Sequence, residues 1–155
     1  DKIGFVFQFF NLLPMLTAEE NIELPMRIAG AKPDPEWQAK LVEATRLGDR
    51  LTHKPAELSG GQQQRVAVAR ALLSQPAVVF GDEPTGNLDS KTSADVLALL
   101  RRAVDEFGQT VIMVTHDASA AAIADRIVFL RDGRIVKDSG SLSAGEILDT
   151  IKTLE

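Results

Sequence analysis

The sequence predicts an α/β fold built on a parallel β-sheet. Three continuous apolar runs, at residues 3–7, 77–81 and 110–115, have the length of strands that are covered on both faces. Helical patterns lie between consecutive runs, and this alternation is typical of neighbouring parallel strands. Asp82 and Glu83 follow the second run directly, where open α/β sheets place their ligands. We therefore expect a ligand site at the carboxyl edge of the sheet.

Composition narrows the class of protein. The chain has 155 residues, of which 45% are hydrophobic and 25% charged, as in one ordinary globular domain. A net charge of -5 argues against a broad basic surface, so no nucleic acid partner is expected. The lack of cysteine excludes disulfides and thiolate zinc sites. No apolar run approaches the roughly 20 residues that span a bilayer, so any work at a membrane requires a partner.

Two helices are predicted between the first strand and residue 50. The pair Thr17 and Glu20 forms a capping box, which begins a helix that is interrupted or bent near Pro25 and ends at Gly30. Asp34, followed by Pro35, begins the second helix, which carries Trp37 as a partly packed core residue and ends at Gly48.

A glycine-rich helix start follows at residues 58–65. Ser59 can cap this helix, and Gln62, three residues later, can complete a capping box. Gly60 and Gly61 lie between them and allow a backbone to approach a phosphate closely. The exposed N–H groups and the positive end of the helix dipole point to the same place, so this start favours an anion.

The remaining elements follow from similar signals. We expect a helix from about Ser90 to Phe107 that Gly108 closes, and a buried strand at 110–115 that ends at His116. The last third is predicted to hold a short helix capped by Asp117 and reaching Ala124, a β-hairpin (127–130 and 135–136) with its turn at Asp132-Gly133, and a final helix with a capping box of Ser143 and Glu146.

Polar side chains at the strand ends suggest phosphate chemistry. Asp82 and Glu83 are adjacent, so they serve different atoms: one can join a magnesium shell while the other accepts a proton from water. Gln8 ends the first strand, where it can equally be an ordinary loop residue. His116 can position a water or bond a terminal phosphate, but a histidine at a strand end can also be purely structural.

Together these residues resemble the ATP-binding subunit of an ABC transporter. Residues 58–62 are similar to the LSGGQ signature, 78–83 to the Walker B strand, 87–89 to the D-loop, Gln8 to the Q-loop glutamine and His116 to the switch histidine. Within the family, the residues around Gln8 most resemble ATPases that serve lipoprotein-releasing, macrolide-exporting and cell-division permeases.

The resemblance implies a role for each candidate residue, with ATP and Mg²⁺ as cofactors. Glu83 would polarise the attacking water, His116 would contact the terminal phosphate, and Asp82 and Gln8 would belong to the metal shell. The signature residues Ser59, Gly60, Gly61 and Gln62 would bind a nucleotide held by a second ATPase subunit across a dimer interface. Asp89 would couple the two nucleotide sites of that dimer. The partners would be that subunit and a transmembrane permease, at the cytoplasmic side of the cell membrane.

One motif of the family is missing. The phosphate loop G-x-x-x-x-G-K-[ST] needs adjacent glycine and lysine, and the chain holds no such pair. We therefore expect residues 1–155 to form a partial ABC ATPase domain of P-loop NTPase type that lacks its N-terminal strands, begins abruptly at Asp1 and is inactive alone. Residues 9–75 would form a helical signature subdomain, and 1–8 with 76–155 a portion of the RecA-like core.

Two other functions stay open on the sequence. One is a soluble ABC-type ATPase in DNA repair or translation, although such proteins carry long coiled-coil insertions or a second cassette, and neither pattern occurs here. The other is a non-catalytic module that presents only its signature to the nucleotide of a partner. The transported substrate cannot be read from this chain.

Overall fold

The computed structural model describes residues 2–154, which form two compact units divided between Val114 and Thr115. The expectation of an abrupt start at Asp1 concerns a residue outside the described range. This division separates the last 41 residues from the rest. The expected functional subdivision, with a helical subdomain at 9–75, is of a different kind and stays a prediction.

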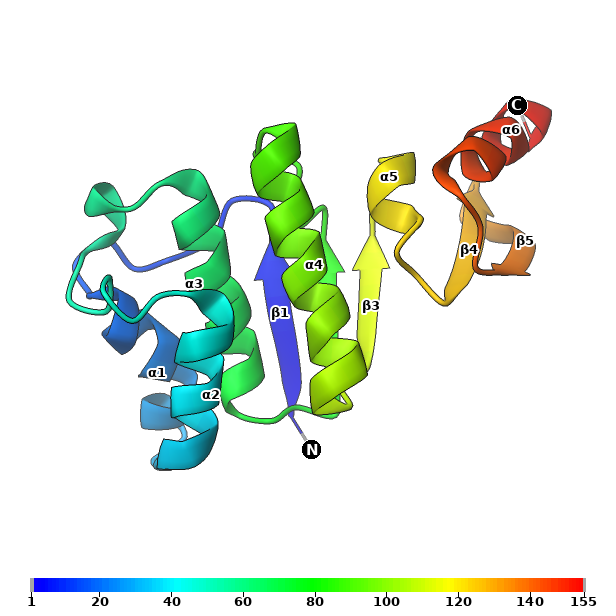
Figure 1. The fold of residues 1–155 in the computed structure, drawn as a ribbon. Coiled ribbons are helices and arrows are strands. Elements are labelled where there is room, and N and C mark those ends of the chain that lie inside the picture. Colours follow the sequence, from blue (N-terminus) through cyan, green and yellow to red (C-terminus); the bar gives the residue numbers. More distant parts are fainter. Residues whose placement is uncertain (1, 155) are drawn as a thin grey trace. The chain divides into compact units, whose positions relative to one another are not determined.

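The first unit is built on a three-stranded parallel sheet (Figure 1). Its strands are β1 (Ile3–Phe7), β2 (Val78–Asp82) and β3 (Val111–Val114), in the order β1-β2-β3. Phe7 is paired with Asp82, and Asp82 is paired with Val114, so all three strands end at the same edge. The predicted parallel sheet is confirmed. The second strand includes Asp82 as its last residue, because the ladder continues to it.

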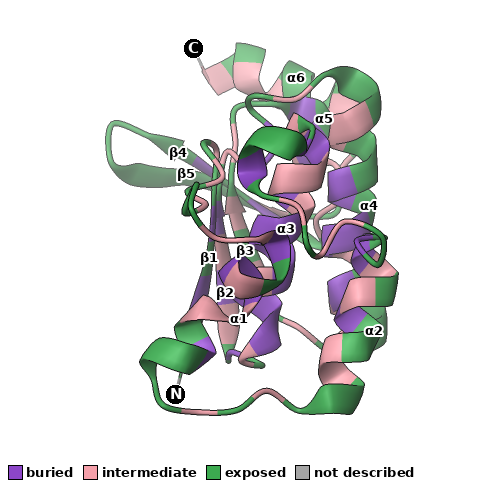
Figure 2. Cartoon of the chain, turned by 90° about the vertical axis from the view of Figure 1, so that its left-hand side faces the viewer, coloured by how far each residue is buried: buried purple, intermediate pink, exposed green. Residues whose placement is uncertain are grey.

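Within residues 2–114, helices cover only one face of this sheet. Helices α3 (Gly60–Leu73) and α4 (Ser90–Phe107) pack around Val6 and Val79, each 1% exposed. Both helices lie on the same side of the strands (Figure 2). The reason is topological: each connection steps to the next strand in the same direction, and connections of one hand then fall on one face.

The opposite face is apolar and open. Its side chains from β1 and β3 include Ile3, Phe5, Ile112 and Val114, which are 47% to 57% exposed. The prediction that these strands are covered on both faces is therefore wrong for the described residues. The apolar runs indicated strands correctly, but they could not show that all helices of the unit that pack on the sheet share one side.

Helix α1 (Ala18–Ile28) begins at the predicted capping box. Thr17 Oγ1 accepts a hydrogen bond from the Glu20 amide at 3.2 Å, and Glu20 Oε1 accepts one from the Thr17 amide at 3.1 Å. The helix is continuous through Pro25, so the predicted interruption does not occur, while the alternative of a bend there stays a prediction. A proline removes one backbone bond, but the next turn still closes, since the Ala29 amide donates to the Pro25 carbonyl at 3.1 Å.

Helix α2 (Pro35–Thr45) begins as predicted, with the Asp34 carboxylate accepting from the Glu36 amide at 3.0 Å. It ends at Thr45 rather than at Gly48, because Arg46 adopts a left-handed conformation with φ of 55°. Trp37 packs edge-on against Phe107 with ring centroids 5.0 Å apart, which confirms its partial core packing. A short 3-10 turn, η1 (Pro55–Glu57), leads into α3.

The second unit holds α5 (Ala118–Ala121), β4 (Arg126–Arg131), β5 (Arg134–Gly140) and α6 (Ala144–Leu154). Strands β4 and β5 form the predicted antiparallel hairpin, with positive φ at both Asp132 and Gly133, as a type I′ turn requires. The Ser143 and Glu146 capping box is confirmed. Asp117 caps α5, which ends at Ala121 instead of Ala124 because the Ile123 and Ala124 amides bond three residues back.

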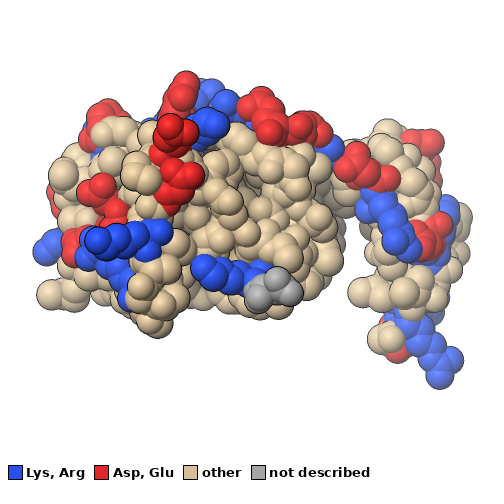
Figure 3. Space-filling model, turned by 90° about the horizontal axis from the view of Figure 1, so that it is seen from below, with Lys and Arg blue, Asp and Glu red and all other residues tan. Residues whose placement is uncertain are grey.

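Charged side chains are unevenly distributed over the surface. On the face shown in Figure 3, acidic and basic groups lie close together along one edge, with a broad uncharged area beside them. Among the described residues, several acidic and basic side chains form i, i+4 ion pairs, such as Arg102 with Glu106 on α4. Within residues 2–154, no helix combines the length and the hydropathy that crossing a membrane requires.

Candidate functional site

The glycine-rich start of α3 has the predicted cap. Ser59 Oγ accepts from the Gln62 amide at 3.1 Å, and Gln62 Oε1 accepts from the Ser59 amide at 2.8 Å. Gly60 and Gly61 form the first helical turn between these two residues. Helix starts of this kind favour anions, because their first N–H groups have no partner within the helix and the helix dipole adds positive potential.

The two glycines let this helix start pack against Leu88 in the loop before α4 and against Thr92 in the first turn of α4. A Cβ atom at Gly61 would lie 2.2 Å from Thr92 Cγ2, and one at Gly60 would lie 3.4 Å from a methyl group of Leu88. Asp89 accepts from the Thr92 amide at 3.0 Å and from Thr92 Oγ1 at 2.8 Å. These two hydrogen bonds hold the pKa of Asp89 below its usual range. The structure thus connects two candidate residues, Gly61 and Asp89, through Thr92.

Gln8 is bonded to the loop that follows β2. Its Nε2 donates to Asn87 Oδ1 at 3.2 Å, and Asn87 Nδ2 donates to the Gln8 carbonyl at 3.2 Å. The Gln8 amide also lies over Gly86, where an added Cβ would come within 2.7 Å of it. Gln8 is therefore joined to the loop after β2 through its side chain and its carbonyl, while its role stays a prediction.

Glu83 has an unusual backbone. Its φ is 44°, in the left-handed region that residues other than glycine seldom adopt. The conformation is held from both sides: the Glu83 amide donates to the Val114 carbonyl at 2.8 Å, and the Glu83 carbonyl accepts from the Gly86 amide at 2.9 Å. Such held strain is concentrated at functional sites. Asp82, the residue before it, is exposed at the end of β2.

The described residues can bind a magnesium ion only if water and phosphate oxygens supply the rest of its ligands. Among the described residues, no group of three or more histidines and carboxylates could hold a metal by itself. Mg²⁺ commonly takes one or two carboxylates from the protein and completes its shell with water and phosphate oxygens. Exposed Asp82, with the amide of Gln8 at the end of the paired strand, suits that pattern.

His116 follows β3 in the chain and belongs to the second unit. The cluster described above lies within the first unit, so the role of His116 stays a prediction from its position in the sequence.

Sequence reasoning missed several residues that build the cluster. Arg70 donates to the Phe10 carbonyl at 2.9 Å and to the Asn11 carbonyl at 2.7 Å. Phe10 and Asn11 are both residues with positive φ. Burial lowers the pKa of Arg70. An arginine in the apolar half of α3 was a signal of such a role. Gln64, also on α3, had no comparable signal, because it follows two other glutamines.

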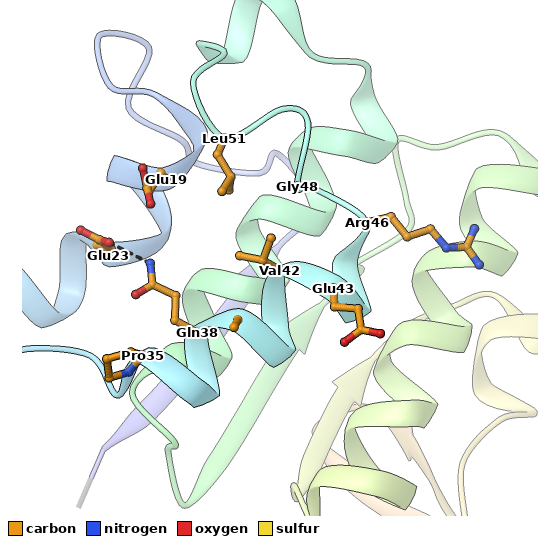
Figure 4. A pocket seen from close by; sticks show the side chains of 10 residues that line it. Glu19, Glu23, Pro35, Gln38, Val42, Glu43, Arg46, Gly48 and Leu51 are labelled. Atoms are coloured by element: carbon orange, nitrogen blue, oxygen red, sulfur yellow. Dashed lines mark hydrogen bonds between the residues drawn. The ribbon is translucent and has the colours of Figure 1, made fainter.

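A hollow of about 530 Å³ opens between α1 and α2 (Figure 4). Its rim carries the carboxylates Glu19, Glu23 and Glu43, and Val42 and Leu51 add apolar surface. Gln38 Nε2 donates to Glu23 Oε1 at 2.8 Å across it. That bond is the largest cause of the lowered pKa of Glu23, which also pairs with Arg27.

Comparison with known proteins identifies the family. The family model described as ABC transporter matches residues 1–86. The chain is 51% identical over 145 residues to the macrolide export ATP-binding/permease protein MacB of Syntrophobacter fumaroxidans, covering 91% of this chain and 20% of that protein. It is 47% identical over 144 residues to the uncharacterized ABC transporter ATP-binding protein MJ0796 of Methanocaldococcus jannaschii, covering 89% and 61%.

A solved structure supports the same assignment. The fold resembles the dimeric post-hydrolysis state of the ATP-binding cassette MJ0796 bound to ADP and Pi, with a TM-score of 0.76 and 43% identity over 92% of this chain and 64% of that one. The chain thus spans less than two thirds of the relatives it matches. The predicted family and α/β fold are confirmed, as is the likeness to macrolide exporters. This chain belongs to the ABC transporter family.

Proposed function

We propose that this chain is part of an ATP-binding subunit that hydrolyses ATP to power a membrane transporter. The observation that carries the proposal is that the loop after β2 meets both other candidate parts: its Asn87 is hydrogen-bonded to Gln8, and its Leu88 packs against Gly60 at the start of α3. The similar dimeric cassette that binds ADP and Pi supports ATP as the nucleotide. The similarity to an ATP-binding/permease protein supports transport over DNA repair or translation.

In this proposal, the two carboxylates at the end of β2 divide the work. Glu83 accepts a proton from the attacking water, and the hydrogen bonds that hold its backbone fix the position from which its side chain extends. Asp82 and Gln8 contribute to the shell of Mg²⁺, which neutralises phosphate charge when bound. His116 contacts the terminal phosphate. No Gly-Lys pair occurs in residues 1–155, so none of their lysines belongs to a phosphate loop of the form G-x-x-x-x-G-K-[ST].

The start of α3 serves the nucleotide of a second subunit. Ser59, Gly60, Gly61 and Gln62 provide amide and hydroxyl donors at a helix start, which suits a terminal phosphate. Asp89, which contacts Thr92 next to Gly61, couples the two sites of the dimer. The dimeric state of the similar cassette supports this arrangement.

A permease subunit is the remaining partner, and it would hold the protein at the inner face of the cell membrane. We assign its contact to the helical segment at 9–75, where the hollow between α1 and α2 offers acidic and apolar surface. The name of the macrolide export relative, which combines ATP-binding and permease parts, supports a permease partner.

Glu83→Gln provides the test. In the complete protein that contains this chain, the substitution is expected to lower steady-state ATP hydrolysis by a factor on the order of 100 or more, because glutamine cannot accept the proton of the water. MgATP binding should persist, and the protein should accumulate as a nucleotide-bound dimer in size-exclusion chromatography. Unchanged turnover would exclude Glu83 as the base. No hydrolysis by the unsubstituted protein would favour a non-catalytic module.

A further inference from the structure

Gln64 is a fully buried polar residue on the same helix as the signature glycines. It is 0% exposed. Its single amide nitrogen donates to two backbone carbonyls, those of Phe7 at 3.0 Å and of Pro84. Phe7 precedes Gln8, and Pro84 follows Glu83. One side chain thus spans the backbones of the two strand-end segments that carry candidate active-site residues.

Stability alone does not account for an amide at this position. Burying an amide costs free energy unless its polar atoms are bonded, and Gln64 Oε1 is buried without a hydrogen-bond partner among residues 2–154. Methionine has a similar volume and carries no such cost. What glutamine provides and methionine cannot is a pair of N–H donors in a fixed geometry.

Other contacts join the same two segments that the Gln64 amide bridges. Gln8 and Asn87 bond to each other, so the two loops that Gln64 bridges are also joined beyond it. The Gln8 amide rests on Gly86 without room for a Cβ. Further along α3, Arg70 holds the Phe10 carbonyl. Side chains of α3 therefore donate hydrogen bonds to backbone carbonyls on both sides of Gln8 and directly after Glu83.

We propose that Gln64 is a positioning residue for ATP hydrolysis, which fixes the backbone of Glu83 relative to Gln8 and to the signature helix. The inference rests on the proposed function, because Glu83 must be the base for its position to matter. Gln64 itself touches neither nucleotide nor water in this role. It acts through the left-handed turn at Glu83, whose neighbour Pro84 it holds by the carbonyl.

The test compares Gln64→Met with Gln109→Met in the complete protein. Gln109 also uses its Nε2 to bridge two carbonyls, those of Pro76 and Thr110, but at the other end of β2 and β3. Gln64→Met is expected to lower kcat by a factor on the order of 10 to 100, as small misplacements of catalytic groups do, while the KM for ATP changes little. Gln109→Met is expected to keep kcat.

A second readout does not depend on activity. Amide hydrogen exchange should accelerate at Glu83 and Gly86 in Gln64→Met and stay unchanged there in Gln109→Met, because both amides belong to the turn that Gln64 holds. Gln64→Glu adds a pH signature: its carboxyl can donate only when protonated, so part of the lost kcat should return as pH falls.

The outcomes separate the two proposals. If Glu83→Gln abolishes hydrolysis but Gln64→Met matches Gln109→Met in kcat and in exchange, the positioning role is overturned while the proposed function stands. If the unsubstituted protein hydrolyses no ATP, the proposed function fails, and with it the role of Gln64 in hydrolysis. Faster exchange at Glu83 and Gly86 in Gln64→Met would then show that the contact holds the turn without serving catalysis.

Discussion

The two faces of the three-stranded sheet differ although the same strands build them. On the packed face, Val6 and Val79 are each 1% exposed beneath α3 and α4. On the open face, Phe5 is 49% exposed and Ile112 is 47% exposed. Both faces are apolar, so residue type alone does not distinguish them. The difference comes from the connections, which place both covering helices on one side.

The comparison shows where the energy of the first unit is concentrated. Burial removes apolar area from water and stabilises in proportion to that area, so the packed face contributes far more than the open one. Helix α3, which covers the packed face, also carries the candidate residues Gly60 and Gly61, as well as Gln64 and Arg70. Substitutions on the two faces should therefore differ in size, and the following predictions can break or sharpen that contrast.

Leu72→Ala is expected to have the largest effect on stability. Leu72 lies on α3, is 1% exposed and belongs to the core of the first unit, so its truncation leaves a cavity. A cost of about 2 to 5 kcal/mol in the free energy of unfolding is typical for such a change. Urea denaturation of the purified protein measures it. Ile28→Ala is the control, because Ile28 is 79% exposed on α1 and should cost little.

Gly4→Ala tests how closely α3 approaches β1. An added Cβ would lie 2.7 Å from the Ala71 carbonyl oxygen, a backbone atom that cannot move without shifting the helix. We expect a loss of about 1 to 3 kcal/mol from overpacking. Gly48→Ala is the matched control, because a Cβ there meets nothing within 4 Å. Equal midpoints for the two variants would mean that α3 is not packed on β1 as described.

Gly61→Ala probes the polar end of the same helix. The new methyl group would meet Thr92 Cγ2, a side-chain atom, so we expect a smaller loss of about 1 kcal/mol. Thr92→Ser removes that atom and keeps the hydroxyl that bonds Asp89. The double variant should therefore recover most of the loss in a double-mutant cycle. If the loss in the double variant equals the sum of the losses in the two single variants, the close contact between Gly61 and Thr92 is excluded.

The local signals in the sequence predicted most of the fold. Capping boxes at Thr17, Ser59 and Ser143 and the turn at Asp132 appear where expected, because each depends on residues a few positions apart. The ends of helices were less predictable. The end of α2 depends on the left-handed Arg46, and no residue preference indicates that arginine for such a conformation.

The sequence pointed to candidate site residues but not to the hydrogen bonds around them. Motif spacing pointed to Gln8, Glu83 and the glycines of the signature. The bonds that join them run between residues 20 to 79 positions apart, as from Gln64 to Pro84 or from Gln8 to Asn87. Such pairs follow from the order and register of the strands, which a single sequence does not specify. Their functional roles stay predictions until the variants are measured.

Ile112→Thr should have the smallest effect, and it tests the open face directly. Threonine keeps the β-branched shape that suits a strand and replaces the ethyl arm of a half-exposed side chain by a hydroxyl, so a change below about 0.5 kcal/mol is expected. Val79→Thr is the matched control on the packed face, where burying the hydroxyl should cost more. If both variants lose stability equally in urea denaturation, the face that carries Ile112 is covered in the purified protein, and the contrast between the two faces belongs only to residues 2–154. Unequal losses would place that contrast in the protein itself.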